Sequence, residues 1–256
     1  MILFLAGTSD ARELAISLKQ KGYQLLVTVV TENASLALLE AGLDVRVGRL
    51  TAEEMVALIS EKQIRAIVDA SHPFAEEASK NAIQAANEAN VPYFRYEREK
   101  IDEYDEQVIS VQSYDEAAEV ALEKKGTIML TTGSKTLATF ANKLIGVEGI
   151  RLVARMLPRK DNMEKCEELG VEQKNIIAIQ GPFSKELNIA LYRQYDVDVM
   201  VTKESGKVGS VDEKVEAALE LGIPIIMIRR PKIDYGQVYS TFDALIEQLQ
   251  MTVEAN

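Results

Sequence analysis

Residues 1–12, MILFLAGTSDAR, decide the fold class of this chain. Ile2 to Ala6 form a continuous apolar run, which is typical of a strand buried on both faces of a parallel sheet. The next residues predict a helix, because Asp10 and Glu13 form an Asp-x-x-Glu start signal and apolar residues then recur on one face. A strand, a glycine turn and a helix in this order are the beginning of a βαβ unit.

The same alternation of short apolar runs and amphipathic segments continues to the end of the chain. Capping patterns predict helix starts at Thr51 with Glu54, at Ser113 with Glu116, and at Ser210 with Glu213. Such alternation implies parallel strands joined by right-handed crossovers. The expected class is α/β, with two Rossmann-like domains, mainly parallel sheets and helices on both faces. Strands are expected at 2–6, 24–30, 44–47, 64–69, 91–95, 127–131, 151–154, 176–179, 197–202 and 225–228.

A polar stretch at 97–106, rich in acidic residues and lysine, separates the two halves. Exposed polar segments are typical of domain boundaries. We therefore expect one Rossmann-like domain at 1–98 and a second at 107–256.

Composition excludes several classes of partner. The chain has 256 residues, of which 47% are hydrophobic, and a formal net charge of −11. Such a charge repels nucleic acid and anionic membranes, and no apolar run approaches the ~20 residues that span a bilayer. The N-terminus lacks the basic region of a signal peptide, and Cys166 is the only cysteine. A reducing compartment, the cytoplasm, is the expected location.

Glycine and hydroxyl residues follow the first strand. Gly7, Thr8 and Ser9 lie between a strand and a helix start, where backbone N–H groups and the helix dipole favour a phosphate. The full G-x-G-x-x-G fingerprint is absent, so plain helix capping remains an alternative. Glu32 follows the second strand, where an acidic residue can bond a ribose hydroxyl, although most such glutamates are merely solvated.

The second half begins with a similar turn, Thr131-Thr-Gly-Ser-Lys135. Ser134 separates Gly133 from Lys135, so the Walker spacing is not met and an ATPase is not expected. Lys135 is a candidate anion contact, with a solvated turn lysine as the alternative.

His72 is the only histidine, and it sits at a strand end within Asp69-Ala-Ser-His-Pro-Phe74. It has no other histidine with which to form a metal cluster, and no metal site is predicted. Neighbouring residues on one turn cannot align as a hydrolytic triad. Cys166, within a predicted helix beside acidic neighbours, is expected to be structural.

Taken in order, the strand-end segments resemble the precorrin-6A reductase family of cobalamin biosynthesis, including its cobalt-precorrin-6A branch. Two departures are Ala6, where the family often has glycine, and Ser71, where threonine is common. The matching segments are Gly7–Arg12, Asp69–Ala75, Pro92–Arg98, Thr132–Lys135, Gly181–Ser184, Thr202–Gly206 and Ile228–Pro231.

The resemblance implies two Rossmann-like domains with a cleft between them, and a nicotinamide cofactor, NADPH or NADH, that delivers hydride to a carbon–carbon double bond. The implied substrate is an anionic tetrapyrrole-derived macrocycle, in its cobalt or metal-free form, and a proton must follow from His72 or from solvent. Expected cofactor-binding residues are Gly7, Thr8, Ser9, Glu32, Ser71, Gly133 and Ser134. Expected substrate-binding residues are Arg95, Lys135, Arg155, Lys203, Ser205 and Gly206.

Two alternatives stay open at this point. The chain could instead be a non-redox two-domain protein that binds a nucleotide or sugar, although such a protein has no need to bring together His72, Lys135, Lys203 and Ser205. The choice between NADH and NADPH is also open. If Glu32 contacts the ribose, its carboxylate repels a 2′-phosphate and favours NADH.

Overall fold

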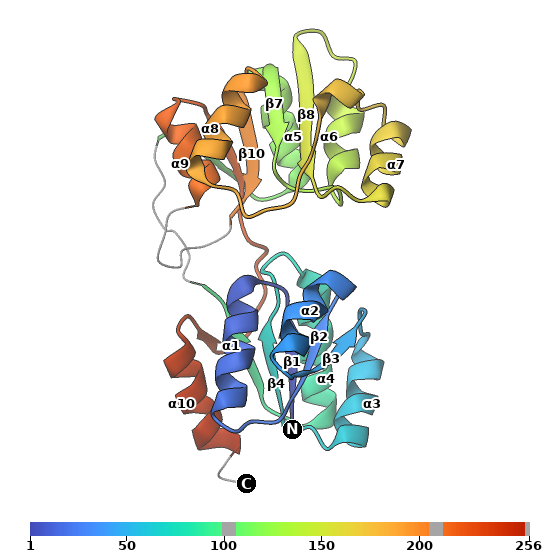
Figure 1. Cartoon of the computed structure of the whole chain (residues 1–256), viewed down its shortest axis with the longest axis vertical. Coiled ribbons are helices and arrows are strands. Elements are labelled where there is room, and N and C mark those ends of the chain that lie inside the picture. The colour runs from blue at the N-terminus through green and yellow to red at the C-terminus, as the bar shows by residue number, and fades with distance from the viewer. Residues whose placement is uncertain (99–105, 205–211, 254–256) are drawn as a thin grey trace. The chain divides into compact units, whose positions relative to one another are not determined.

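The computed structural model describes residues 1–98, 106–204 and 212–253. The chain forms two compact units, the first made of Met1–Glu99 with Pro231–Asn256 and the second of Lys100–Arg230. Each unit holds a six-stranded sheet (Figure 1), and every strand pairing in the described residues is parallel. The predicted α/β class with two Rossmann-like halves is confirmed.

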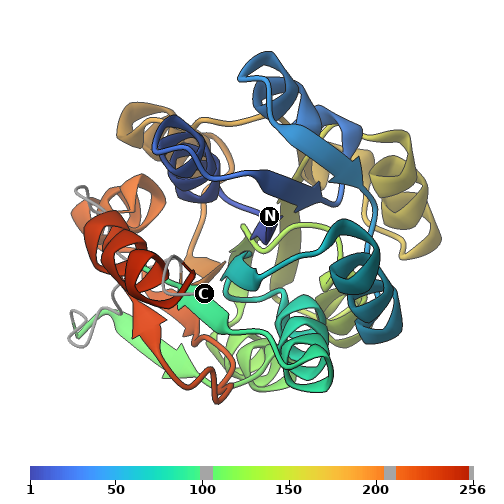
Figure 2. The same cartoon turned by 90° about the horizontal axis from the view of Figure 1, so that it is seen from below.

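The first sheet has the strand order β12-β5-β4-β1-β2-β3. The order reverses between β1 and β4, so the switch point, where ligands bind in open α/β sheets, lies at the carboxyl ends of these two strands. Helices α1 and α10 pack on one face and α3 and α4 on the other (Figure 2). The strands are β1 (Ile2–Ala6), β2 (Leu25–Val29), β3 (Asp44–Val47), β4 (Ala66–Ala70), β5 (Tyr93–Tyr96) and β12 (Val238–Tyr239). The helices are α1 (Ser9–Gln20), α2 (Glu32–Glu40), α3 (Ala52–Lys62), α4 (Glu76–Ala89) and α10 (Phe242–Val253).

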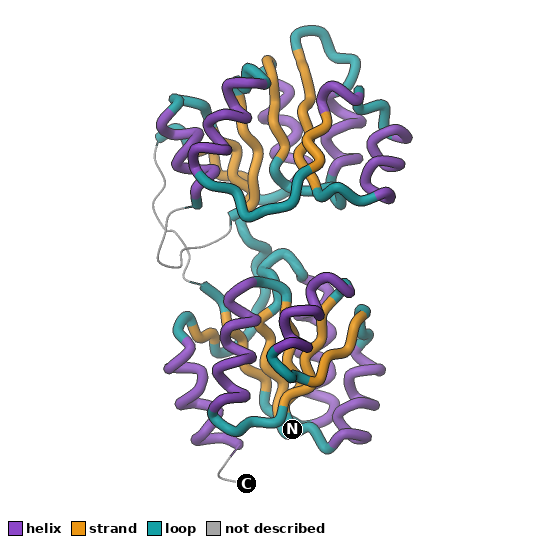
Figure 3. Tube along the Cα trace, in the orientation of Figure 1, coloured by secondary structure: helices purple, strands orange, loops and turns teal. Residues whose placement is uncertain are grey.

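The second sheet has the order β6-β11-β10-β7-β8-β9, with its switch point between β7 and β10. Helices flank this sheet as they flank the first (Figure 3), with α8 and α9 sharing one core cluster. The strands are β6 (Val108–Val111), β7 (Gly126–Leu130), β8 (Ile150–Met156), β9 (Ile176–Ala178), β10 (Val199–Lys203) and β11 (Ile225–Ile228). The helices are α5 (Tyr114–Lys124), α6 (Leu137–Leu144), α7 (Lys160–Glu168), the 3₁₀ turn η1 (Gln173–Asn175), α8 (Lys185–Gln194) and α9 (Glu213–Glu220).

The expected domain boundary is wrong for the C-terminal segment, because residues 231–256 return to the first unit. Strand β12 pairs with β5, with Val238 opposite Arg95. Helix α10 places Leu245 and Leu249 in the same core as β1 and α1. The alternating pattern of strands and helices does not indicate which of the two sheets a C-terminal element joins. In the structure, α10 covers the apolar residues Phe94 and Tyr96 of β5.

Local signals were mostly sufficient to find the elements, with three exceptions. The short strands β6 and β12 and the helix α2 were not predicted, since edge strands that are only partly buried lack a continuous apolar run. The expected linker at 97–106 begins later, because the Glu97 N–H bonds to the Tyr239 carbonyl and Glu97 is buried. Residues 99–105 of that linker lie outside the described residues.

Two of the predicted helix starts are confirmed by their capping residues. Thr51 and Glu54 form the full capping box of α3, and Ser113 caps α5. Helix α1, however, is capped by Thr8 and not by Asp10, since the Thr8 hydroxyl accepts from the Ala11 N–H. Ser210 lies outside the described residues, and α9 is capped by Asp212. Among the described residues no helix is long and apolar enough to span a membrane.

Leu245→Ala is expected to destabilise the first unit by about 2–5 kcal/mol, because Leu245 is fully buried in the core beneath α1. The measurement is urea unfolding of the full chain. Met251→Ala, at a residue that is 66% exposed on the same helix, is the matched control and should change stability by less than about 0.5 kcal/mol. Equal midpoints for wild type and Leu245→Ala would contradict the assignment of α10 to this core.

Candidate functional site

Two loops meet at the switch point of the first unit, one after β1 and one after β4. A Cβ atom added to Gly7 would lie only 2.9 Å from the backbone nitrogen of His72. No side chain fits at that distance, so glycine is required for the two loops to approach. The contact brings the predicted phosphate turn and the predicted catalytic loop together.

The turn residues Thr8 and Ser9 already make hydrogen bonds within the protein. The Thr8 hydroxyl accepts from the Ala11 N–H at 3.1 Å, which is the N-cap of α1. The Ser9 hydroxyl donates to Asp10 Oδ1 at 3.3 Å. The capping alternative for Thr8 is therefore correct, and it leaves the first N–H groups of α1 directed at whatever lies beyond the strand end.

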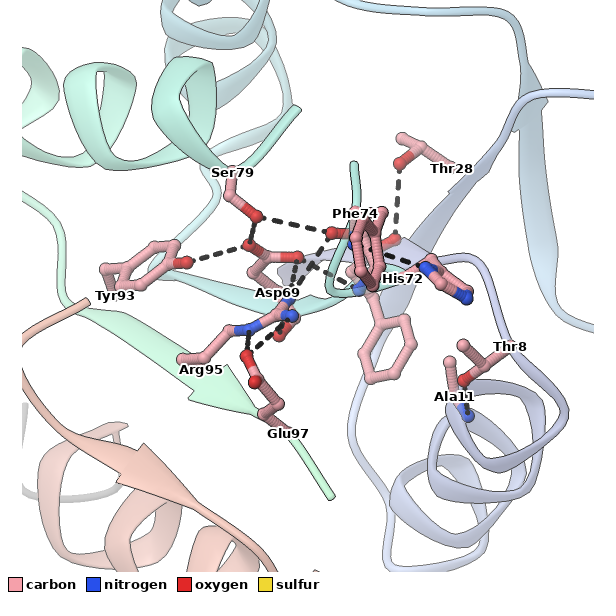
Figure 4. A network of polar contacts seen from close by, with 12 residues as sticks. Thr8, Ala11, Thr28, Asp69, His72, Phe74, Ser79, Tyr93, Arg95 and Glu97 are labelled. Atoms are coloured by element: carbon pink, nitrogen blue, oxygen red, sulfur yellow. Dashed lines mark hydrogen bonds and ion pairs between the residues drawn. The ribbon is translucent and has the colours of Figure 1, made fainter. Parts of the chain in front are cut away.

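The β4–α4 loop is anchored by the buried carboxylate of Asp69, on β4 (Figure 4). Oδ1 accepts from the Ser71 N–H at 2.9 Å. Oδ2 accepts from the Ser79 hydroxyl, on α4, and from the Tyr93 hydroxyl, on β5, each at 2.7 Å. These bonds fix the start of the loop that carries His72.

Arg95, on β5, completes the network. Its guanidinium is 0% exposed, contacts Asp69 Oδ1 at 2.9 Å and donates from Nε and Nη2 to Glu97 Oε2, each at 3.1 Å. The ring of Tyr235, from the C-terminal segment, covers the guanidinium at 4.7 Å. Burial alone would lower the pKa of Arg95, but Asp69, Tyr235 and Glu97 together raise it, so the guanidinium stays charged.

This burial changes the interpretation of two expected site residues. The Arg95 guanidinium is enclosed by protein partners and has no surface for a substrate carboxylate. Ser71 is also buried, and its hydroxyl accepts from Arg95 at 3.3 Å. In the first unit, both residues support the loop from within.

His72 itself is half-buried and its ring orientation is fixed locally. The Phe74 N–H donates to His72 Nδ1 at 3.2 Å, and the two rings lie 5.8 Å apart. Because Nδ1 accepts a hydrogen bond, the proton of the neutral ring is on Nε2. The neutral side chain therefore offers a hydrogen-bond donor at Nε2.

Glu32 is exposed at the first turn of α2, immediately after β2 and the capping residue Thr31. Since β2 is the neighbour of β1, Glu32 lies on the side of the turn where a ribose is bound in dinucleotide sites. An acidic side chain at a helix start is also favoured by the helix dipole, so this position has a structural explanation as well.

The switch point of the second unit gathers lysines. Gly133 adopts a left-handed φ of +80°, which allows the turn Gly133-Ser134-Lys135 between β7 and α6. Lys203 ends β10, the neighbour of β7. Burial, followed by the ammonium groups of Lys135 and Lys214, lowers the pKa of Lys203. The Lys214 ammonium also contacts Asp212 Oδ2 at 2.7 Å, so its charge is compensated within the protein.

The remaining expected residues are distributed differently. Arg155, on β8, is buried, donates to Asn188 Oδ1 at 2.7 Å and stacks on Phe183 at 4.4 Å, so it holds α8 and its preceding loop. Ser205 and Gly206 lie outside the described residues. Cys166 is buried, and its burial raises the pKa of the thiol, which agrees with a structural role.

Three contributors were missed from the sequence: Tyr235 over Arg95, Lys214 near Lys203, and an ion pair between Asp10 and Arg98. Each is far in sequence from its partner or lies in a segment without a strand-end motif. Arg98 stood out in the sequence as a cation after the fifth strand, but nothing in the sequence indicated Asp10 as its partner.

The family model described as "Precorrin-6x reductase CbiJ/CobK" matches residues 1–250. A "Cobalt-precorrin-6A reductase" of Priestia megaterium is 64% identical over 249 residues, which cover 97% of this chain and 98% of the relative. A "Precorrin-6A reductase" of Rhodococcus erythropolis is 31% identical, with 91% of this chain and 90% of the relative covered.

A solved structure described as "CobK precorrin-6A reductase" matches with a TM-score of 0.81 at 22% identity, covering 98% of this chain and 96% of that one. It shows that both units and their order in the chain follow that fold. The family model and the full-length relatives together carry the assignment. This chain belongs to the precorrin-6x reductase CbiJ/CobK family.

Proposed function

We propose that this chain is a nicotinamide-dependent reductase that transfers hydride to a ring carbon–carbon double bond of cobalt-precorrin-6A. The observation that carries the proposal is the family match over 1–250, in a chain whose Gly7 turn touches its His72 loop at a switch point. The cobalt form is preferred because the relative at 64% identity bears that name. Membership of a reductase family disfavours the non-redox nucleotide- or sugar-binding hypothesis.

The first unit fits a dinucleotide. Gly7 is exposed and carries no side chain between the strand end and a ligand, and the N–H groups of the first turn of α1 favour a diphosphate. Glu32 would accept hydrogen bonds from the ribose hydroxyls. When bound, the reduced nicotinamide supplies the hydride.

The second unit supplies the charge that an anionic macrocycle needs. The chain carries a net charge of −11, so a polycarboxylate requires a local cluster of cations. Lys135 and Lys203 provide it at the β7–β10 switch point, and Ser134 adds a hydroxyl. Orientation by these groups matters more than any side-chain chemistry, because hydride transfer depends on the geometry of the two reactants.

The test of this function is oxidation of NADH by the purified full chain in the presence of cobalt-precorrin-6A, followed at the nicotinamide absorbance. The wild type should use NADH better than NADPH, because the Glu32 carboxylate repels a 2′-phosphate. Glu32→Gln should lower the ratio of kcat/KM for NADH to kcat/KM for NADPH about tenfold, because it removes one negative charge near the 2′-phosphate. Failure of wild type to bind either nucleotide at millimolar concentration would refute the reductase, and a strong preference for NADPH would refute the ribose contact alone.

His72→Ala is expected to lower kcat by about 10²-fold or more if the imidazole is the proton donor. His72→Gln separates two roles, because glutamine retains a donor near the Nε2 position but cannot transfer a proton. Retained activity in His72→Gln would assign a hydrogen-bonding role, and loss in both variants supports proton transfer. An unchanged rate and pH profile in His72→Ala would remove His72 from the reaction.

Lys203→Met should raise KM for the macrocycle about tenfold or more, the effect of losing one charge-assisted hydrogen bond to a carboxylate. The substitution should not destabilise the folded protein at neutral pH, because the lowered pKa of Lys203 means that its charged form is less favourable in the folded than in the unfolded chain. Lys185→Met, at an ion-paired residue on α8, is the control. Unchanged KM in Lys203→Met would exclude this lysine from the substrate site.

A further inference from the structure

An ion pair joins the start of α1 to the residue that follows β5. Arg98 donates from Nε to Asp10 Oδ2 and from Nη2 to Asp10 Oδ1, so the guanidinium and the carboxylate form a bidentate ion pair. The Asp10 side chain is 9% exposed and the Arg98 side chain 27%. Strand β4 lies between β5 and β1 in the sheet, so this pair reaches past the carboxyl end of β4 at the switch point.

Asp10 creates an electrostatic problem for the proposed cofactor. It is an acidic residue in the first turn of α1, where it interacts favourably with the positive end of the helix dipole. A diphosphate would use the same helix end, so an uncompensated Asp10 carboxylate would compete with it and repel it. The site therefore needs a nearby positive charge that cancels Asp10.

We propose that Arg98 is a positioning residue for the dinucleotide diphosphate, acting through Asp10. By neutralising and holding that carboxylate, Arg98 leaves the first N–H groups of α1 available to the phosphates. The proposal rests on the proposed function, since it takes the dinucleotide site to be the turn at Gly7. It assigns a role to two residues that the hydride-transfer scheme does not use.

The pair also contributes to folding, because the Asp10 side chain is only 9% exposed and loss of Arg98 would leave its charge uncompensated. The helix dipole already stabilises an acidic residue at this position, so the effect of Arg98 on a ligand must be measured separately from its effect on stability. The interaction also orders the long side chain of Arg98, the last described residue after β5.

The proposal makes a prediction about charge that a packing role does not make. Arg98→Gln leaves Asp10 uncompensated and should weaken a diphosphate ligand. Asp10→Asn removes the repulsion and should leave binding equal or tighter. The double variant Asp10→Asn/Arg98→Gln carries neither the carboxylate nor the guanidinium. It should recover most of the affinity for the diphosphate ligand that Arg98→Gln loses. A purely structural pair predicts that the double variant binds no better than Arg98→Gln.

The experiment is calorimetric titration of the full-length wild type and the three variants with ADP-ribose, which carries the diphosphate without nicotinamide, and with adenosine, which carries neither. Arg98→Gln should bind ADP-ribose about tenfold more weakly at low salt, the effect of one unit charge beside a partly exposed anion. The loss should shrink as salt is added. Adenosine binding should change less than twofold in every variant.

Thermal unfolding of each variant, together with Arg98→Lys, controls for misfolding, because lysine restores the charge without the paired geometry. Wild-type affinity in Arg98→Gln, or a double variant as weak as Arg98→Gln, would overturn the proposal while leaving the reductase intact. Wild type that binds neither ADP-ribose nor NADH would overturn the proposed function itself. The two failures are therefore distinguishable.

Discussion

Asp69 on β4 and Arg95 on β5 form an ion pair from which water is excluded, and the carboxyl edge of the first unit is built around it. Removing one partner of such a pair would leave an uncompensated buried charge, which costs about 3–5 kcal/mol in other proteins. The pair is acceptable only because every remaining polar group around it is used. Ser71, Ser79 and Tyr93 donate to Asp69 or surround it, and Glu97 takes the other edge of the guanidinium.

This constraint extends into the site in two directions. Toward β1, the bond from the Ser71 N–H to Asp69 fixes the loop, and His72 then lies so close to Gly7 that no side chain fits between them. Toward the C-terminus, Tyr235 covers the guanidinium of Arg95. The segment that returns from the second unit therefore helps to exclude water from the ion pair that supports the His72 loop.

The two units use their strand-end cations differently, which composition alone could not reveal. In the first unit, Arg95 forms ion pairs with Asp69 and Glu97, and Arg98 forms an ion pair with Asp10. In the second unit, Arg155 supports α8, and burial, followed by the like charges of Lys135 and Lys214, lowers the pKa of Lys203. Among the strand-end cations in the described residues, Lys135 and Lys203 are the two that we propose as contacts for an anionic ligand. Arginine suits the internal roles because its planar fork satisfies a carboxylate with two bonds.

The sequence by itself determined the α/β class, the strands β1, β4, β7 and β11, and the capping box at Thr51 and Glu54. It also predicted that a ligand binds at the strand ends. These features are local: apolar periodicity and capping depend on residues within a few positions of each other. Only the tertiary structure decided that residues 231–256 complete the first sheet, that Arg95 is an internal support, and that Arg98 pairs with Asp10. Each of these depends on contacts between residues far apart in the chain, and a short sequence pattern carries no information about which distant group will neutralise a buried charge.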